Sequence, residues 1–212
     1  MNALQEFDKK YALELKTGAL FGIDEAGRGP LAGPVVACAC AIDDSLYPNF
    51  SDVNDSKKLT HKKREEIFAR MQKLGVLYGV GFASAAEIDH LNILQATFLA
   101  MRRAAQKFYN LPGAVALVDG PHLVQELTLP QHAVVDGDAK SFNIAAASIV
   151  AKVLRDRYMD KLDELYPGYD FASHKGYGTA KHLAAIKKLG PCPEHRKTFA
   201  PIRNLLQPTL FP

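Results

Sequence analysis

The sequence predicts an α/β fold, in which one sheet is covered by helices and a small helical extension follows at the C-terminal end. Two observations lead to this prediction. Short apolar runs bounded by glycine and proline, a pattern typical of buried strands, alternate with segments of helical periodicity. The last third of the chain holds helical patterns alone. Because 212 residues suffice for one sizeable core, we expect a single structural unit with an N-terminal segment over 1–18, a core over 19–165 and the helical extension over 166–212.

Five apolar runs are predicted to form the sheet. The first two are almost wholly apolar, as expected of central strands, and the last two each end in acidic residues. Strand ends are where α/β folds gather ligands, so these acids are candidates for a site. The runs cover 19–24, 33–42, 75–84, 113–120 and 131–138.

The predicted helices lie between and after these runs. Thr60 can cap the helix that follows it, and Ser84 with Glu87 has the spacing of a capping box. The longest helix is stopped by Pro167, and the last is stopped by Gly190. The helical patterns cover 61–74, 92–109, 141–166 and 179–189.

Composition narrows the class of protein. A hydrophobic fraction of 48% and a charged fraction of 23% are typical of a globular protein and not of a disordered one. Residues 1–18 lack the apolar core of a secretory signal and no run is long enough to span a bilayer, so we expect a cytoplasmic protein without a membrane partner. A net charge of +3 permits a polyanionic partner without requiring one.

The cysteines are odd in number, which favours a reducing compartment. Cys38 and Cys40 alternate along one apolar run, where they are expected to pack as small hydrophobic residues. Cys192 and His195 form a C-x-x-H pair, but a structural zinc site needs four ligands and the sequence offers no second pair at metal spacing. A zinc site is therefore not expected.

Acidic residues follow three of the apolar runs: Asp24 and Glu25 the first, Asp119 the fourth, and Asp136 or Asp138 the fifth. If they converge, their mutual repulsion requires cations, and hard oxygen ligands suit Mg²⁺ or Mn²⁺. Two such ions can activate a water and stabilise a departing oxygen, which is how phosphodiester bonds are cut. The alternative is that each acid is only a solvated cap or turn former.

A glycine-rich turn, "GRGPLAG", follows the first two acids directly. The third glycine, Gly33, comes one position too late for a dinucleotide-binding fingerprint, and no G-K-[ST] follows as a phosphate loop would need. Gly27 and Gly29 instead let the main chain approach a ligand closely, and Arg28 could hold a phosphate. Such a backbone could read the 2′-hydroxyl that separates RNA from DNA. The alternative is a plain turn with a solvent-facing arginine.

Basic and aromatic residues could support a nucleic acid, although each also has an ordinary structural explanation. Lys57 opens a basic run over 57–64, which is usually a solvated helix face. Glycines flank Tyr177 and leave its ring free to stack, with basic residues nearby, but a half-buried loop tyrosine is the alternative. On the long helix, three residues share one face, where they could line a strand channel or decorate the surface: Ser148, Lys152 and Arg155. Residues 194–202 are expected only to dock the C-terminal end.

Seven segments, in order and at compatible spacing, resemble the bacterial ribonuclease HII family, the type 2 ribonucleases H. The resemblance covers nearly the whole chain, roughly residues 19–206, and the first and fifth segments are highly specific. The resemblance implies a ribonuclease H-like fold, with a mixed five-stranded sheet flanked by helices and helical C-terminal elements that help to bind substrate. The segments are "GIDEAGRGPLAGPVVA", "NDSKKL", "LNILQATFLAMRRA", "VDG", "GDAKSFNIAAASIVAKVLRD", "HKGYGTAKH" and "HRKTFAP".

The resemblance also implies roles for individual residues. The metal-binding quartet would be Asp24, Glu25, Asp119 and Asp138. The ribose 2′-hydroxyl would be read by Gly27, Arg28 and Gly29, and Tyr177 would pack on the sugar. The phosphate contacts would be Lys57, Ser148, Lys152, Lys181 and His182. The chain departs from the family pattern at Asp136, which places a second acid before "GDA". In an extended segment Asp136 and Asp138 would point the same way. The role is assigned to Asp138 because it aligns with the family's "GDA".

The resemblance implies a two-metal endonuclease, dependent on Mg²⁺ or Mn²⁺, that hydrolyses the RNA strand of RNA·DNA hybrids. It would also cut 5′ of single ribonucleotides embedded in duplex DNA and leave 3′-hydroxyl and 5′-phosphate ends. The rival functions are a non-catalytic nucleic-acid binding module and a two-metal DNA nuclease of the same fold. We expect a monomer. The tail "QPTLF", Gln207 to Phe211, resembles a peptide that binds a sliding clamp, although a frayed terminus is the alternative.

Overall fold

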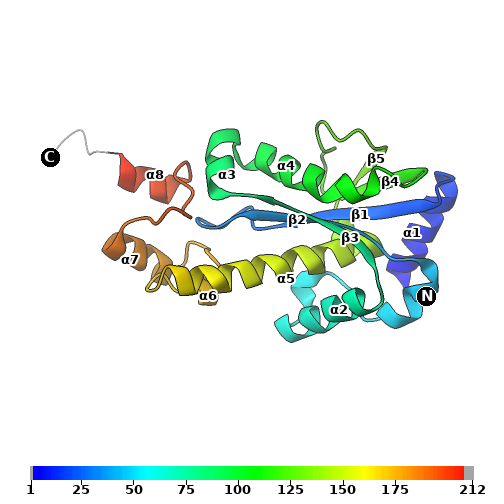
Figure 1. Ribbon diagram of the computed structural model, residues 1–212, viewed down its shortest axis with the longest axis horizontal. Helices are drawn as coiled ribbons and strands as arrows, with labels where there is room; N and C mark the ends of the chain where they lie inside the picture. The colour runs from blue at the N-terminus through cyan, green and yellow to red at the C-terminus, as the bar shows by residue number, and fades with distance from the viewer. Residues whose placement is uncertain (1, 208–212) are drawn as a thin grey trace.

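A mixed five-stranded sheet forms the centre of the molecule in the computed structural model, which describes residues 2–207 (Figure 1). The strand order is β3-β2-β1-β4-β5, in which β1 pairs antiparallel with β2, β2 antiparallel with β3, and β1 and β5 each parallel with β4. The predicted α/β class and the five-stranded sheet are confirmed. The strands are β1 Ala19–Ala26, β2 Val35–Ala41, β3 Leu77–Ala83, β4 Ala114–Asp119 and β5 Gln131–Val134.

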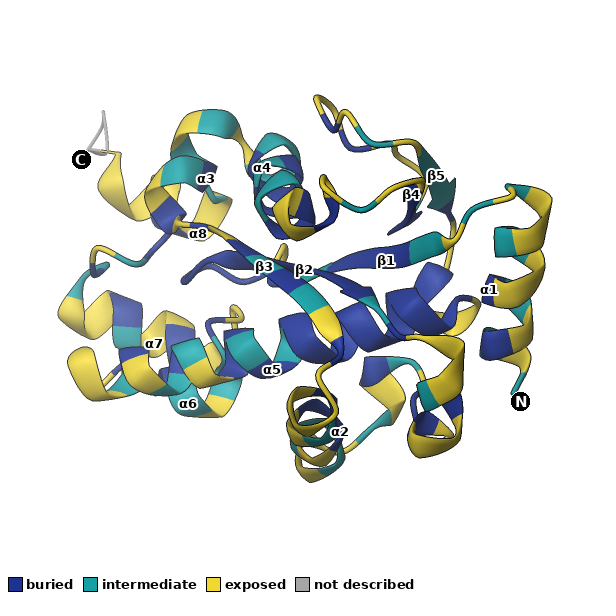
Figure 2. Cartoon of the chain, turned by 45° about the vertical axis from the view of Figure 1, so that its right-hand side comes forward, coloured by how far each residue is buried: buried dark blue, intermediate teal, exposed yellow. Residues whose placement is uncertain are grey.

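Helices cover both faces of this sheet (Figure 1). On one face, α4 (Ile93–Ala105) packs over apolar side chains of β1 and β2. On the other face, α5 (Phe142–Leu165) and α2 (His61–Lys73) pack over the alternate side chains of β2, among them Cys38 and Cys40. Figure 2 shows that α5 is buried over much of its length, between the sheet and α2. The two cysteines therefore pack as predicted, as free thiols in the core.

Small residues let the helices lie directly on the strands. A Cβ atom added at Gly81 of β3 would stand 2.0 Å from the carbonyl oxygen of Ala100 in α4. A Cβ atom at Gly22 of β1 would stand 2.2 Å from the backbone nitrogen of Ile144, in the first turn of α5. Because no side chain fits in either gap, glycine at these positions fixes how closely each helix approaches the sheet.

The capping signals of the sequence are present. The Thr60 side chain accepts a hydrogen bond at the start of α2, and Ser84 and Glu87 form a capping box on α3. No helix among residues 2–207 has the length and apolar character to cross a membrane. The remaining helices are α1 Ala3–Glu14, α3 Ala85–Leu91, α6 Phe171–His174, α7 Ala180–Leu189 and α8 Ala200–Leu206, and the 3₁₀ turns are η1 Asp44–Phe50, η2 Ser56–Lys58, η3 Gln106–Phe108 and η4 Gly137–Ala139.

Two elements differ from the sequence prediction. The segment before residue 19 holds a helix, α1, whose Asn2 and Gln5 form a capping box; its buried Asp8 accepts a hydrogen bond from the Asn143 backbone at the start of α5. The fifth strand ends at Val134 rather than running on to the acids. Asp136 adopts a left-handed conformation with φ of 54°, which ends the extended segment and starts η4.

Candidate active site

Four carboxylates lie together at one edge of the sheet. Asp24 and Glu25 are near the end of β1, and Asp119 ends β4, which runs parallel beside it; the register pairs Ile23 with Val118, so Asp24 and Asp119 follow side by side. Asp138 comes from η4, where its backbone and that of Gly137 donate hydrogen bonds to Asp119 Oδ1 at 3.3 and 2.7 Å. The parallel pairing of β1 and β4 thus brings together acids that are 95 residues apart.

Burial and mutual repulsion disfavour the charged forms of these acids. Burial, with the charges of Glu25 and Asp119, raises the pKa of Asp24 well above its usual value. Burial raises the pKa of Asp119, and Asp138 raises it further. The pKa of Glu25 is also raised by burial, although the Arg28 guanidinium opposes the shift. The cluster is therefore a site that a bound cation would stabilise.

Two exposed basic side chains now supply positive charge to the cluster. Lys57 Nζ donates to Asp138 Oδ2 at 2.9 Å, and Arg28 Nη1 lies 3.5 Å from Glu25 Oε1. Within residues 2–207 no three acidic, histidine or cysteine side chains already stand in a metal-binding arrangement. The donor set nevertheless fits a hard divalent ion, because it consists of crowded carboxylate oxygens whose present cationic partners are on solvent-exposed side chains.

Asp136 and Asp138 do not point the same way, and the expectation that they would is wrong. It assumed an extended segment, whereas the left-handed Asp136 turns the chain before η4. Asp138 is consequently buried beside Asp119, and Asp136 is exposed. Of these two acids, the fold brings Asp138 to the cluster.

A cavity of about 260 Å³ joins the acids to the glycine turn. Tyr177 lines it from the opposite side, and its Cε1 atom lies 3.5 Å from where a Cβ atom of Gly29 would be. Tyr177 is 47% exposed, so part of its side chain is accessible to a ligand, although it is also half-buried in its loop. Gly27 and Tyr177 thus line one space together with Asp24, Glu25 and Asp119, and Gly29 lies beside Tyr177. The cavity is lined by Asp24, Glu25, Ala26, Gly27, Ser56, Lys57, Arg64, Asp119, Ser148, Lys152, Arg155 and Tyr177.

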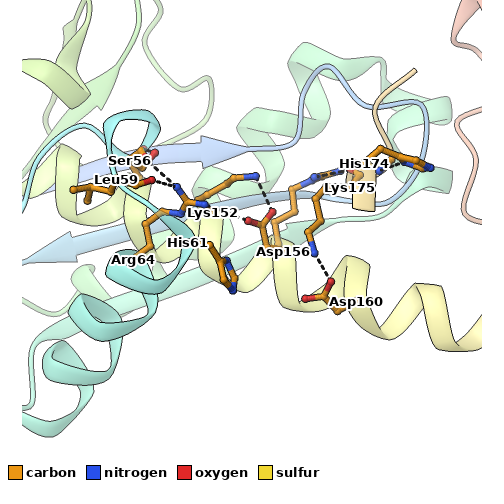
Figure 3. A network of polar contacts seen from close by, with 12 residues as sticks. Ser56, Leu59, His61, Arg64, Lys152, Asp156, Asp160, His174 and Lys175 are labelled. Carbon is orange, nitrogen blue, oxygen red and sulfur yellow. Dashed lines mark hydrogen bonds and ion pairs between the residues drawn. The ribbon is translucent and has the colours of Figure 1, made fainter. Parts of the chain in front are cut away.

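A polar network includes three residues that line this cavity, Ser56, Arg64 and Lys152 (Figure 3). The Ser148 hydroxyl lies 2.9 Å from that of Ser56 and its hydrogen bond lowers the pKa of Asp24, so Ser148 supports an acid rather than reaching into solvent. Lys152 Nζ donates to Asp156 at 2.7 Å, and Arg64 donates to the carbonyl of Ser56. The contact between Ser56 and Ser148 holds η2, which carries Lys57, against α5.

His182 is a corrected prediction. Its side chain is fully buried, so it cannot touch a phosphate. Its Nδ1 lies 2.9 Å from the Tyr177 carbonyl oxygen and its Nε2 lies 3.1 Å from Nε2 of His195. Because a carbonyl only accepts, Nδ1 carries the proton and Nε2 accepts one from His195. The pair thus anchors the Tyr177 loop, whereas Lys181 is 70% exposed, pairs with Asp170 and stays available to a ligand.

Arg155 and Arg196 are the residues whose role the sequence did not reveal. Arg155 was expected either to line a channel or to decorate the surface, and Arg196 only to dock the C-terminal end. Both are fully buried and donate hydrogen bonds to carbonyl oxygens of the glycine turn. Arginine is rarely buried, so its residue type gave no signal for this contact.

The chain is similar to known proteins both in sequence and in fold. The sequence profile of the family described as Ribonuclease HII matches residues 21–202. The Ribonuclease HII of Syntrophotalea carbinolica is 52% identical over 185 residues, which are 87% of each chain. The RNase HII of Archaeoglobus fulgidus, solved in a complex with PCNA, is 28% identical and aligns with a TM-score of 0.70 over 90% of this chain and 98% of its own. Bst-RNase HIII, solved in complex with Mn²⁺, shares the fold at 19% identity, with a TM-score of 0.69 over 92% of this chain and 71% of its own.

Proposed function

Because the chain belongs to the ribonuclease HII family and is a hydrolytic ribonuclease, we propose that it cuts the RNA strand of RNA·DNA hybrids and incises 5′ of single ribonucleotides in duplex DNA. The products would carry 3′-hydroxyl and 5′-phosphate ends. The observation that carries this proposal is the shared cavity, in which the acid cluster meets a glycine turn and an exposed tyrosine. A scissile phosphate held at the acids would place its ribose against Gly29 and Tyr177.

We propose that Asp24, Glu25, Asp119 and Asp138 hold two divalent ions, Mg²⁺ or Mn²⁺, after Lys57 and Arg28 release their carboxylates. Ions bound there would supply water activation and stabilise the departing oxygen. The raised pKa values of Asp24 and Asp119 support this assignment, because they show crowded carboxylates that need a cation. The complex of Bst-RNase HIII with Mn²⁺ supports it as well.

The chain's own residues would bind and orient the nucleic acid. Gly27, Arg28 and Gly29 present the backbone at which a 2′-hydroxyl is read, and Tyr177 packs on the sugar. Lys57, Lys152 and Lys181 would contact phosphates, and of these Lys57 stands beside the acids and Lys181 belongs to the C-terminal extension over 166–212. Ser148 would act through Asp24, which it hydrogen bonds.

One assay tests this function against its rivals. The purified protein is incubated with Mg²⁺ or Mn²⁺ and three matched duplexes: all DNA, DNA with one ribonucleotide, and DNA paired with an all-RNA strand. The proposal expects cleavage of the last two alone, with single-ribonucleotide cuts on the 5′ side. Absence of cleavage with every duplex would leave a non-catalytic binding module, and equal cleavage of the all-DNA duplex would identify a DNA nuclease of the same fold.

A second proposal concerns a partner. The Archaeoglobus fulgidus relative was solved in a complex with PCNA, and we propose that the tail of this chain binds a sliding clamp. Apart from Gln207, the segment from Gln207 to Phe211 lies outside the described residues. Binding of the full chain to a clamp, and its loss on deletion of residues 207–212, would support the proposal. Absence of clamp binding by the intact chain would end it. We also propose that the protein is cytoplasmic and monomeric.

A further inference from the structure

Two buried guanidinium groups hold the glycine turn from behind. Arg196, from the segment after α7, donates Nη2 to the Gly27 carbonyl at 2.6 Å, Nη1 to the Arg28 carbonyl at 2.8 Å, and both Nε and Nη2 to the Gly33 carbonyl. Arg155, from α5, donates Nε to the Pro34 carbonyl at 3.1 Å and Nη2 to the Ala32 carbonyl at 3.3 Å. Five carbonyl groups between residues 27 and 34 are thus turned toward these two side chains.

This arrangement is costly for the fold. Neither guanidinium has a carboxylate partner among residues 2–207, although a buried cation ordinarily needs one. Burial lowers the pKa of Arg155 to about 10 and that of Arg196 to about 9, and the charge of Arg155 adds to the shift at Arg196. Both remain protonated at neutral pH. Two adjacent cations whose partners are carbonyl oxygens and, for Arg196, the Phe199 ring at 5.1 Å are a poor means of stabilising a turn, which points to a requirement on backbone direction.

The orientation of the carbonyls fixes that of the neighbouring N–H groups. In a trans peptide the C=O and the following N–H point in opposite directions. Because the Gly27 and Arg28 carbonyls face Arg196, the N–H groups of Arg28 and Gly29 face away from it. Within residues 2–207 neither N–H has a hydrogen-bond acceptor. Two adjacent donors beside the acids match the lone pairs of a ribose 2′-oxygen, which deoxyribose lacks.

The same side chains tie the turn to the tyrosine loop. Arg155 Nη1 donates to the Lys175 carbonyl at 3.1 Å, and the backbone N–H of Leu31 donates to the Gly176 carbonyl at 2.8 Å. Added Cβ atoms show how tightly these parts fit, since one at Gly176 would stand 2.6 Å from the Ala32 carbonyl oxygen. The spacing between the turn and Tyr177 is therefore set by Arg155 as well as by the loop itself.

We propose that Arg155 and Arg196 are positioning residues that set the selectivity for ribose, by turning the carbonyls of residues 27–34 inward so that the Arg28 and Gly29 N–H groups receive the 2′-hydroxyl. The proposal rests on the proposed cleavage at ribonucleotides. It assigns the recognition of the 2′-hydroxyl to backbone geometry maintained by two buried side chains.

The test uses the full chain with Arg196→Met, Arg196→Lys and Arg155→Lys, and Arg103→Met as the matched control. Arg103 also donates to a backbone carbonyl, that of Phe82, but from α4 on the other face of the sheet. Binding to a duplex with one ribonucleotide and to the same all-DNA duplex is measured with Ca²⁺ in place of Mg²⁺. Steady-state cleavage of the ribonucleotide duplex with Mg²⁺ and thermal unfolding are measured in parallel.

The Arg196 variants should lose about tenfold or more of the preference for the ribonucleotide duplex, equal to about 1.4 kcal/mol, while binding to the all-DNA duplex is unchanged. Lysine keeps the charge but not the forked donors, so Arg196→Lys and Arg155→Lys should not restore the preference, and they decide the question if the methionine variant fails to fold. Arg103→Met should keep the wild-type preference.

Equal losses on both duplexes, or full rescue by lysine, would overturn the proposal, since they would show a general structural role or a role of charge alone. A wild-type protein that neither cleaves nor prefers the ribonucleotide duplex would instead overturn the proposed function itself.

Discussion

Gly27→Ala should destabilise the fold, whereas Gly29→Ala should leave stability nearly unchanged and impair cleavage, although the two glycines flank the same arginine. Gly27 has φ of +100°, and a Cβ atom there would stand 2.0 Å from Arg155 Nε and 2.7 Å from the Pro34 carbonyl oxygen. The backbone strain costs about 1–3 kcal/mol. Displacing Arg155 adds a lost charge-assisted hydrogen bond of about 1.5–3 kcal/mol. Gly27→Ala should therefore destabilise the fold by about 2.5–6 kcal/mol.

At Gly29 the backbone is not left-handed, and a Cβ atom would make only an ordinary contact, 3.5 Å from Tyr177 Cε1. The methyl group enters the space proposed for the ribose. Gly29→Ala should hence leave stability nearly unchanged and impair cleavage of the single-ribonucleotide duplex.

Thermal unfolding and steady-state cleavage measure the two effects separately. For a chain of this length, 1 kcal/mol shifts Tm by about 2–4 °C, so Gly27→Ala should lower Tm by about 5–24 °C and Gly29→Ala by less than about 2 °C. The kcat/KM of Gly29→Ala should nevertheless fall well below that of the wild type at a temperature where both are folded. If Gly29→Ala lowered Tm as much as Gly27→Ala, or cleaved normally, the reasoning would be refuted.

Three further predictions concern the acids and the buried histidines. In cleavage assays at saturating Mn²⁺, Asp138→Asn should reduce kcat by more than about 100-fold, whereas Asp136→Asn should stay near the wild type. An equal reduction of kcat by both variants would show that the metal-binding role does not belong to Asp138 alone. Lys57→Met should tighten Mn²⁺ binding about two- to fivefold in calorimetric titration, because the exposed ion pair between Lys57 and Asp138 competes only weakly with the metal for the carboxylate. Unchanged affinity would show that Lys57 does not compete with the metal. Burial lowers the pKa of His195 to about 4 against 6.5 when unfolded. Because the unfolded chain binds a proton at His195 at a higher pH than the folded protein does, the free energy of unfolding is at its full value above pH 6.5. It decreases as pH falls toward 4, by about 3 kcal/mol in total. Urea unfolding of His195→Asn should show a correspondingly smaller dependence on pH than the wild type, and an equal dependence would contradict this.

The features that sequence predicted best are those written in local patterns. Thr60 and Ser84 cap their helices because capping depends on residues within one turn. Asp24 and Asp119 could be expected at one edge because the ends of adjacent parallel strands meet there. The Asn2 and Gln5 capping box is a signal of the same kind, and it could have revealed α1.

The features that escaped prediction depend on contacts between distant residues or on a single backbone conformation. Asp136 leaves the extended region at one dihedral angle, which periodicity does not report. His182 lies at a helical position beside exposed Lys181, and only its contact with His195 shows that it is buried. Arg196 looked like a surface residue because its acceptors are carbonyl groups, which every residue possesses.

The long span between Gly27 and Arg196 has a consequence for the order in which the protein is made. The hydrogen bond between them joins residues 169 apart, whereas the last of the four acids is residue 138. On a ribosome, Arg196 follows Gly27 by roughly 10–30 seconds. A nascent or prematurely ended chain would thus contain every carboxylate of the proposed metal site before it had acquired the side chain that we propose aligns the glycine turn. Under that proposal, synthesis of the C-terminal segment is the step that adds selectivity for ribose.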